Sequence, residues 1–385
     1  MKRILILYAK YGGGHYSAAK AMQTYFEENY FDVNVKLIDC VEYYSPLLNK
    51  ATTSAYKQMA KRAPWAWKKL YYKSEKGLIE KVSKSSTKAM AKKLHNLIKE
   101  FLPDIVISTH FFATQMVSYL KEHHNVKCIL ATILTDFAPH EQWLVGKEYG
   151  DLFFVSNEQM KTELLKSGIQ ENKIFITGIP VSERFSSKFN IDEIYRQHYL
   201  NTDKKVILFF GGGEFGLGKN RTVQILKSLV SHLNEYQIIA ISGKKKKMND
   251  EFLKLHKQLE QENNPNIEDL HIYKYTTDVP ELMKISSLVV TKPGGLTSSE
   301  SIVSNLPMLI INPIPGQEEE NAEFLENSGV GVWLKKDDDI DEVINSLLLD
   351  SNKLSEMSKK CELLRKPDST KDIGKIILEH YRPIV

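Results

Sequence analysis

Short apolar runs alternate with longer amphipathic segments along all 385 residues of the chain. Most of these runs are apolar at every position rather than at alternate positions, which is typical of parallel strands covered on both faces. Segments with helical periodicity separate the runs, so each half of the chain is predicted to be a doubly wound α/β domain. The predicted strands are 3–9, 33–38, 104–109, 127–135, 152–156 and 173–177 in the first half, and 205–210, 237–242, 270–275, 288–291, 307–312 and 330–334 in the second.

A chain of this length is too long for one ordinary domain and suits two. We expect an N-terminal domain over 1–182 and a C-terminal domain over 200–368, joined by a polar segment that follows Pro180. The final segment, 370–385, begins with helical periodicity and is expected to pack back on the first domain. Two such domains would face each other across a cleft at the carboxyl ends of both sheets.

The first predicted strand runs into the sequence YGGGH at 11–15. Glycines between a strand and a helix can cradle a phosphate, or they can let a bulky acceptor approach the backbone closely. His15 is the candidate general base, because a neutral imidazole accepts a proton near pH 7. The alternative is a histidine that caps the following helix. Asp136 follows another predicted strand and either orients His15, contacts an acceptor or caps a helix.

Two further glycine loops lie in the second half, in GGGEFGLG at 211–218 and KPGGLTSSE at 292–300. In the second of these, Gly294 and Gly295 free the backbone at a helix start whose N–H groups and hydroxyls suit a diphosphate. Glu300 could accept the ribose hydroxyl protons, and polar groups at Gln317 and Glu318 could bind the hydroxyls of a sugar. The alternatives are tight turns without a ligand and ordinary acidic residues at helix starts.

The segment from Lys50 to Glu100 carries 13 lysines and one arginine against three glutamates. Aromatic residues interleave with the lysines, as expected for a surface that docks on anionic lipid. The alternatives are a solvated lysine-rich face with two core tryptophans, and nucleic-acid binding, which the scarcity of arginine and the lack of a known motif disfavour. The residues concerned are Trp65, Trp67, Lys68, Lys69, Tyr71 and Tyr72.

The sequence predicts no metal site. The acidic cluster KKDDDIDE at 335–342 follows a strand and precedes a helix, which favours a solvated helix start over metal ligands. Cys40, Cys128 and Cys361 are scattered without metal-ligand spacing, as expected for reduced thiols in the cytoplasm. Without a metal, helix dipoles, backbone N–H groups and Lys244 or Lys219 could balance the charge of a bound diphosphate.

The chain resembles the family 28 glycosyltransferases that add sugars to diacylglycerol, with the bacterial processive glucosyltransferases closest. The shared sequence motifs are YGGGH at 11–15, TDFAPHEQW at 135–143, TGIPV at 177–181, VTKPGGLTSSE at 290–300 and PGQEEENA at 315–322. This resemblance implies the GT-B fold, two Rossmann-like domains facing a cleft, with the nucleotide sugar bound mainly by the second domain. By resemblance, the donor site comprises Gly14, Gly213, Gly216, Lys244, Tyr275, Gly294, Gly295, Leu296, Thr297, Glu300, Gln317, Glu318 and Asn321.

The resemblance also implies the reaction, an inverting transfer of a hexose from a UDP-hexose to diacylglycerol with His15 as base. Glucose is the expected sugar and galactose the second choice. No cofactor or metal is expected, and the protein should attach to the inner face of the cell membrane. The alternatives are N-acetylglucosaminyl transfer to a polyprenyl-diphosphate acceptor, UDP-sugar epimerisation, and a UDP-sugar sensor that binds a partner.

Overall fold

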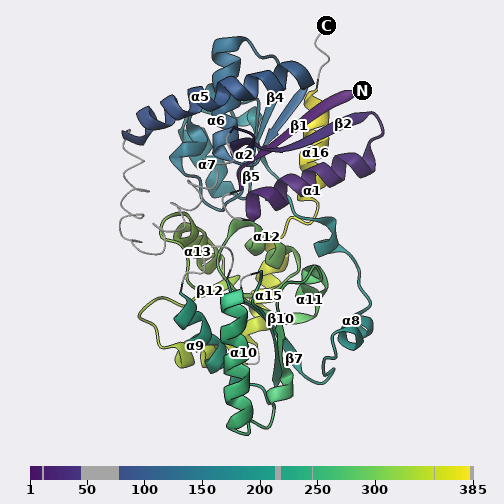
Figure 1. Cartoon of the computed structure of the whole chain (residues 1–385), viewed down its shortest axis with the longest axis vertical. Coiled ribbons are helices and arrows are strands. Elements are labelled where there is room, and N and C mark those ends of the chain that lie inside the picture. Colours follow the sequence, from purple (N-terminus) through teal and green to yellow (C-terminus); the bar gives the residue numbers. More distant parts are fainter. Residues whose placement is uncertain (11–12, 45–77, 213–217, 245, 351, 382–385) are drawn as a thin grey trace. The chain divides into compact units, whose positions relative to one another are not determined.

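The computed structural model divides into two compact units, each with its own sheet (Figure 1). It describes residues 1–10, 13–44, 78–212, 218–244, 246–350 and 352–381, with the side chains of 78–89 left out. The N-terminal unit comprises Met1–Glu183, Pro315–Glu320 and Lys366–Val385, and the C-terminal unit comprises Arg184–Ile314 and Asn321–Arg365.

The N-terminal unit is built on a parallel six-stranded sheet of order β2-β1-β3-β4-β5-β6. Because β2 and β3 lie on opposite sides of β1, the order of the strands reverses between β1 and β3. Ligands of open α/β sheets bind at the carboxyl ends of the strands beside such a reversal. The strands are β1 (Lys2–Tyr8), β2 (Val33–Asp39), β3 (Ile105–Ser108), β4 (Ile129–Ile133), β5 (Leu152–Val155) and β6 (Ile174–Ile176).

Helices cover both faces of this sheet, which explains why its strands are apolar at consecutive positions. Leu5 and Leu7 of β1 pack on one face with α5 (Leu78–Phe101) and α6 (Phe111–His124). Ile4 and Ile6 pack on the other face with α1 (Gly14–Asn29) and α16 (Ser369–His380). The remaining α-helices described in this unit are α2 (Cys40–Tyr44) and α7 (Glu158–Lys166).

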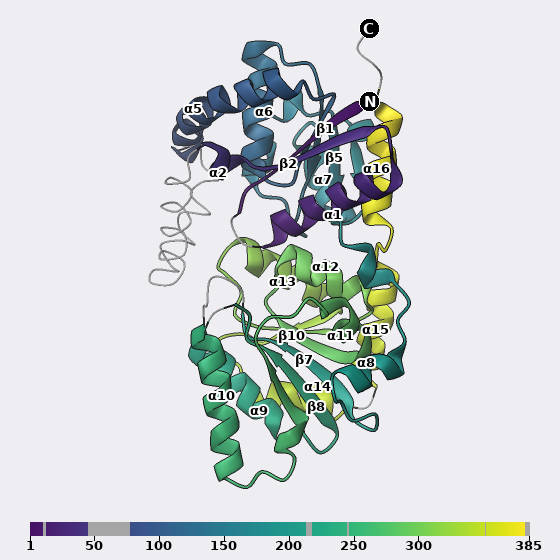
Figure 2. The same ribbon diagram turned by 45° about the vertical axis from the view of Figure 1, so that its right-hand side comes forward.

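Helix α16, at the far end of the sequence, belongs to the N-terminal unit and lies beside α1 (Figure 2). Ser369 and Thr370 begin this helix, and their hydroxyls donate to the backbone oxygens of Ile179 (2.9 Å) and Val181 (2.7 Å). Further along, Gly374 faces the ring of Tyr25, where a Cβ would lie 2.2 Å from a ring carbon. The last helix is therefore an integral part of the first core.

The C-terminal unit has a second parallel six-stranded sheet, of order β12-β11-β10-β7-β8-β9. Its strand order reverses between β7 and β10, so the same rule places a ligand site at their carboxyl ends. The glycine loops at 211–218 and 292–295 directly follow these two strands. The strands are β7 (Lys205–Phe210), β8 (Tyr236–Ile241), β9 (Leu270–Tyr273), β10 (Ser286–Thr291), β11 (Met308–Ile310) and β12 (Gly331–Trp333).

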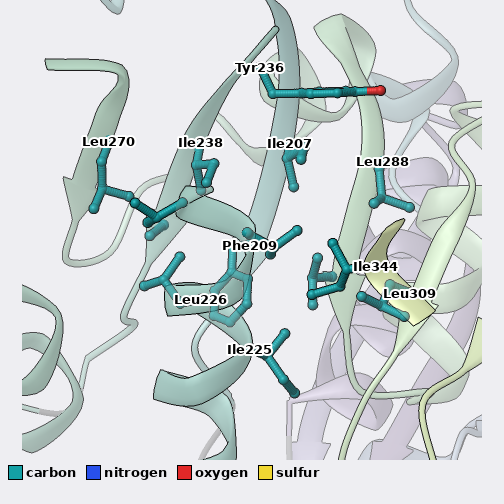
Figure 3. Packing of buried hydrophobic residues seen from close by; sticks show 14 of the residues in the cluster. Ile207, Phe209, Ile225, Leu226, Tyr236, Ile238, Leu270, Leu288, Leu309 and Ile344 are labelled. Carbon is teal, nitrogen blue, oxygen red and sulfur yellow. The ribbon is translucent and has the colours of Figure 1, made fainter. Parts of the chain in front are cut away.

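A large hydrophobic cluster of this unit packs between one face of the sheet and several helices (Figure 3). Ile207 and Phe209 of β7 point into it, as do Ile225 and Leu226 of α9 and Ile344 of α14. The α-helices of the unit are α8 (Ile191–Gln197), α9 (Lys219–Val230), α10 (Lys246–Gln261), α11 (Val279–Ile285), α12 (Gly295–Val303), α13 (Gln317–Asn327), α14 (Ile340–Leu348) and α15 (Lys353–Leu364), although the start of α13 groups with the N-terminal unit.

The predicted fold class, two doubly wound α/β domains, is confirmed, and a strand is present in each of the twelve predicted segments. Several strands are shorter than their predicted runs, and two of them concern the surroundings of His15. The predicted strands 104–109 and 127–135 are observed as Ile105–Ser108 and Ile129–Ile133. The residues after them, Thr109 and Thr135, leave the sheet and contact His15 instead.

Candidate active site

The first glycine loop connects β1 to α1 beside the reversal of strand order in the N-terminal sheet. Helix α1 begins at Gly14, and Gly13 caps it without a side chain. His15 therefore lies in the first turn, where the backbone N–H groups have no partner inside the helix. Gly13 carries no side chain, and no atom lies within 4 Å of the position that a Cβ would occupy there.

Two threonines from neighbouring strands hold His15 in place. The Nδ1 of His15 lies 2.8 Å from the backbone oxygen of Thr109, which follows β3, and 2.9 Å from the hydroxyl of Thr135, which follows β4. The hydroxyl of Thr109 donates in return to the backbone oxygen of His15, at 2.9 Å. These contacts fix the orientation of the imidazole before any ligand binds.

The partners of His15 also determine its tautomer. A carbonyl oxygen only accepts hydrogen bonds, so Nδ1 carries the hydrogen and donates it to Thr109. In the neutral ring, Nε2 then keeps a lone pair and can accept a proton. Burial lowers the pKa of His15 to about 4, and the bond to the Thr109 oxygen opposes this shift only in part. The imidazole is therefore neutral at pH 7, in the form that a general base requires.

Two more histidines, His110 and His140, lie at the same end of the sheet as His15. The ring of His110 lies 4.5 Å from that of His15, nearly perpendicular to it, and His110 itself is buried. Its Nδ1 accepts the backbone N–H of Phe112 at 3.2 Å and so caps α6. Burial lowers the pKa of His110 well below its ordinary value, and burial lowers that of His140 to about 3. Three neutral imidazoles thus lie at one end of the sheet.

Asp136 is buried directly after Thr135, and its carboxylate accepts a hydrogen bond from the Nε2 of Gln317. Gln317 belongs to the short segment 315–320 that groups with the N-terminal unit. The side chain that reaches Nδ1 of His15 is that of Thr135 rather than its neighbour. The proposed contact between Asp136 and an acceptor stays a prediction. Glu318 lies beside Gln317 in the first turn of α13.

In the C-terminal unit, the Gly-Gly loop after β10 leads into α12. Gly294 caps this helix in an extended conformation and Gly295 begins it, so the first N–H groups of the helix are not satisfied by a cap side chain. Asn321 is fully buried, and its amide donates to the backbone oxygen of Pro293 at 3.1 Å. This bond ties α13 to the loop. Leu296 and Thr297 complete the first turn.

Glu300 follows one turn later on α12, where burial raises its pKa to about 8. The carboxyl is therefore largely protonated at pH 7 and offers one donor and one acceptor. Such a pair suits two adjacent hydroxyl groups. A carboxyl kept neutral by burial is unusual for a simple surface residue at a helix start and is typical of functional sites.

The two lysines proposed for charge neutralisation differ in their surroundings. The Lys244 ammonium lies over the ring of Tyr275, 4.3 Å from its centroid, and Tyr275 is exposed. Lys219 at the start of α9 is paired with Glu251 at 2.6 Å. Lys244 is therefore the more available of the two cations.

Some predicted site residues lie outside the described part of the chain. They are Gly213 and Gly216 of the glycine loop and the proposed membrane residues Trp65, Trp67, Lys68, Lys69, Tyr71 and Tyr72.

In the acidic cluster at 335–342, two carboxylates accept hydrogen bonds from nearby backbone N–H groups of the C-terminal unit. Asp338 accepts the backbone N–H of Lys335 at 2.7 Å, and Asp339 caps α14 by accepting that of Glu342 at 3.0 Å. Among the described residues, no group of three or more His, Cys, Asp or Glu side chains is arranged to hold a metal ion.

In the part of the chain that the structure describes, no helix has the length and apolar character that crossing a bilayer requires.

Sequence reasoning missed three residues of the His15 environment, namely Thr109, His110 and Thr135. Each of them lies within two residues of the carboxyl end of a largely apolar strand, β3 for Thr109 and His110 and β4 for Thr135. That position is the signal that could have revealed them, because the carboxyl ends of adjacent parallel strands meet at one edge of a sheet.

Comparison with solved structures defines the class of fold. UDP-GlcNAc 2-epimerase from Neisseria meningitidis bound to UDP-GlcNAc superposes with a TM-score of 0.61 at 12% identity, covering 98% of this chain and 100% of that one. Acinetobacter baumannii MurG gives 0.63 at 13% identity, with the same coverage. At these identities the likeness concerns the fold alone, and it confirms the predicted GT-B class.

Sequence comparison then defines the family. Residues 15–181 match the family described as monogalactosyldiacylglycerol (MGDG) synthase, and residues 206–373 match the glycosyltransferase family 28 C-terminal domain. A processive diacylglycerol beta-glucosyltransferase of Bacillus cytotoxicus is 30% identical over 98% of this chain and 93% of its own length. That of Bacillus licheniformis is 30% identical over 100% and 96%, respectively. The chain belongs to this family of glycosyltransferases, which confirms the resemblance noted in the sequence.

The contacts of His15 predict its titration. In a ¹⁵N-histidine NMR titration, we expect the ring to be neutral at pH 7 and to reach half protonation only at about pH 4, because burial lowers its pKa. Nδ1 should carry the hydrogen throughout this range. The His15→Gln variant assigns the signal by its loss. A midpoint near the ordinary value of about 6.5 would contradict the burial described above.

Proposed function

We propose that the chain transfers glucose from UDP-glucose to diacylglycerol, with inversion at the anomeric carbon, and so forms a β-glucosyl lipid. The observation that carries this proposal is the match over nearly the whole chain to processive diacylglycerol beta-glucosyltransferases. The geometry around His15 supports it, because a neutral imidazole with a free lone pair is held at the carboxyl end of the sheet.

In the proposed reaction, Nε2 of His15 takes the proton from the acceptor hydroxyl as its oxygen attacks the anomeric carbon. The bond from that carbon to the diphosphate breaks, and UDP leaves with the electron pair. Because the attack and the departure occur on opposite sides of one carbon, the configuration inverts. Gly13 and Gly14, which carry no side chains, would leave room for the lipid acceptor to approach the imidazole.

The C-terminal unit supplies most of the groups proposed for the donor, and Gln317 and Glu318 come from the segment 315–320 that groups with the N-terminal unit. The first N–H groups of α12, from Gly295 to Thr297, would bind the diphosphate with the favourable end of the helix dipole. The neutral carboxyl of Glu300 would bind the two ribose hydroxyls. The loop at Tyr275 would bind uracil, with Lys244 near the developing negative charge. Gln317 and Glu318 are proposed to contact the hexose.

We also propose that no divalent ion takes part in the chemistry. Helix dipoles and backbone N–H groups can stabilise a leaving diphosphate when they are preorganised. The carboxylates of the one acidic cluster that could suggest a metal site already accept backbone hydrogen bonds.

Diacylglycerol lies in a membrane, so the enzyme must dock on one. We propose that the basic and aromatic segment within 50–100 binds anionic lipid at the inner face of the cell membrane. The proposal rests on its sequence, in which tryptophans and tyrosines interleave with lysines. Aromatic rings favour the headgroup level, and each lysine near an anionic surface contributes up to about 1 kcal/mol.

A turnover assay tests the proposed reaction. With diacylglycerol micelles and a panel of radiolabelled UDP-glucose, UDP-galactose and UDP-GlcNAc, we expect a glucolipid product, with a β linkage seen by NMR. The His15→Ala variant should lose about 10²- to 10⁴-fold in kcat, the usual contribution of a general base, and keep its affinity for UDP. The exposed His123→Ala variant is the matched control. Full activity of the His15→Ala variant would overturn the assignment of the base, and a protein that only senses UDP-sugars would give no product.

Chelation tests the metal proposal. Turnover after exhaustive treatment with EDTA should equal that of the untreated enzyme, because no step requires a cation. Restoration of a lost activity by Mg²⁺ or Mn²⁺ would contradict the proposal.

Vesicle binding tests the membrane proposal. Sedimentation with anionic phosphatidylglycerol vesicles should show binding that weakens as salt rises, because salt screens the lysines. The Trp65→Ala/Trp67→Ala variant should bind several-fold more weakly. The variant Lys246→Glu/Lys247→Glu changes exposed lysines of α10 and serves as the charge control. Equal binding of wild type and tryptophan variant to neutral vesicles would argue against the proposal.

A further inference from the structure

We propose that Thr135 is the positioning residue of the base, so that His15 is oriented by a hydroxyl and a backbone carbonyl. This inference rests on the proposed function, in which His15 takes the proton of the acceptor. It assigns to Thr135 a role that the sequence suggested only for its neighbour Asp136.

The contact has an ordinary hydrogen-bond length, and its threonine is buried. The Thr135 hydroxyl lies 2.9 Å from Nδ1 of His15, and Thr135 is 4% exposed. Because the single hydrogen on Nδ1 points to the Thr109 oxygen at 2.8 Å, the Thr135 oxygen shares that hydrogen as a second acceptor. The two oxygens therefore flank one N–H group, which restrains rotation of the ring.

The backbone holds Thr135 rigidly on both sides. The residue before it, Leu134, donates its N–H to the oxygen of Phe154 at 3.0 Å. The residue after it, Asp136, accepts the hydroxyl of Ser156 at 2.8 Å through its backbone oxygen. Both bonds tie the segment to β5 and the turn that follows it. A β-branched side chain on a fixed backbone has few rotamers, so the hydroxyl is preorganised toward His15.

This arrangement has a consequence for the chemical step. When Nε2 accepts the proton from the acceptor hydroxyl, the ring becomes a cation while Nδ1 keeps its hydrogen. Two oxygens at Nδ1 then stabilise the positive charge that develops in the transition state, and no proton passes to Thr135. Hydrogen bonds to charged groups are stronger than those between neutral groups, so loss of the hydroxyl should affect turnover more than substrate binding.

The experiment compares three full-length variants. Thr135→Val keeps the shape and removes the hydroxyl, and we expect kcat to fall about 10- to 100-fold with an unchanged KM for UDP-glucose. Thr135→Ser restores a hydroxyl and should recover most of the loss. Thr132→Val is the matched control, because Thr132 is a fully buried residue of β4 whose hydroxyl lies 3.3 Å from that of Thr114. It should retain kcat within about twofold, since it does not contact His15.

A second measurement does not depend on activity. In NMR spectra without substrates, the Nδ1 hydrogen of His15 should exchange with water faster in Thr135→Val than in wild type or Thr132→Val. Unchanged exchange and kcat in Thr135→Val would overturn the proposal, as would an equal loss of kcat in Thr132→Val. If wild type gave no glucolipid but the exchange rates differed as expected, the proposed function would fail while the positioning of His15 would stand.

Discussion

Burial of both faces of each parallel sheet is the constraint on which the rest of the structure depends. Helices occupy the two faces, so consecutive residues of β1 face different cores and must all be apolar. Few polar side chains, such as that of Thr132 in β4, are then buried within the sheets. At the carboxyl ends, loops leave the sheet and helices begin, which brings hydroxyls, imidazoles and unsatisfied N–H groups together. The chemistry of each unit follows from this exclusion.

The two units apply the same arrangement to different tasks. In each, the strand order reverses beside the first strand, and a glycine loop follows a strand next to that reversal. In the N-terminal unit the loop carries His15, a neutral base held by threonines. In the C-terminal unit the loop after β10 exposes the start of α12, with the neutral carboxyl of Glu300 one turn away. Burial raises the pKa of the acid and lowers that of the base, because it disfavours both charged forms.

The histidine needs no carboxylate to select its tautomer. The oxygen of Thr109 fixes the hydrogen on Nδ1, and the hydroxyl of Thr135 shares it. A carboxylate partner would raise the pKa of the ring and favour its charged form. Uncharged oxygens leave the pKa low, so the imidazole is ready to accept a proton over a wide range of pH. A lower pKa also makes the imidazole a weaker base. A weaker base suits the proposed reaction, because the acceptor hydroxyl loses its proton only as its oxygen attacks the anomeric carbon.

The twelve strands, the two doubly wound units and the family could be predicted from the sequence, because apolar runs and glycine motifs are local patterns. The same patterns identified His15 and Glu300 as candidates. What surrounds these two residues depends on the tertiary structure. Thr109 and Thr135 are 94 and 120 residues from His15 in the sequence and meet it through the order of the strands. The protonation of Glu300 and His15 was likewise decided by burial, which depends on segments distant in the chain and cannot be read from a residue and its neighbours.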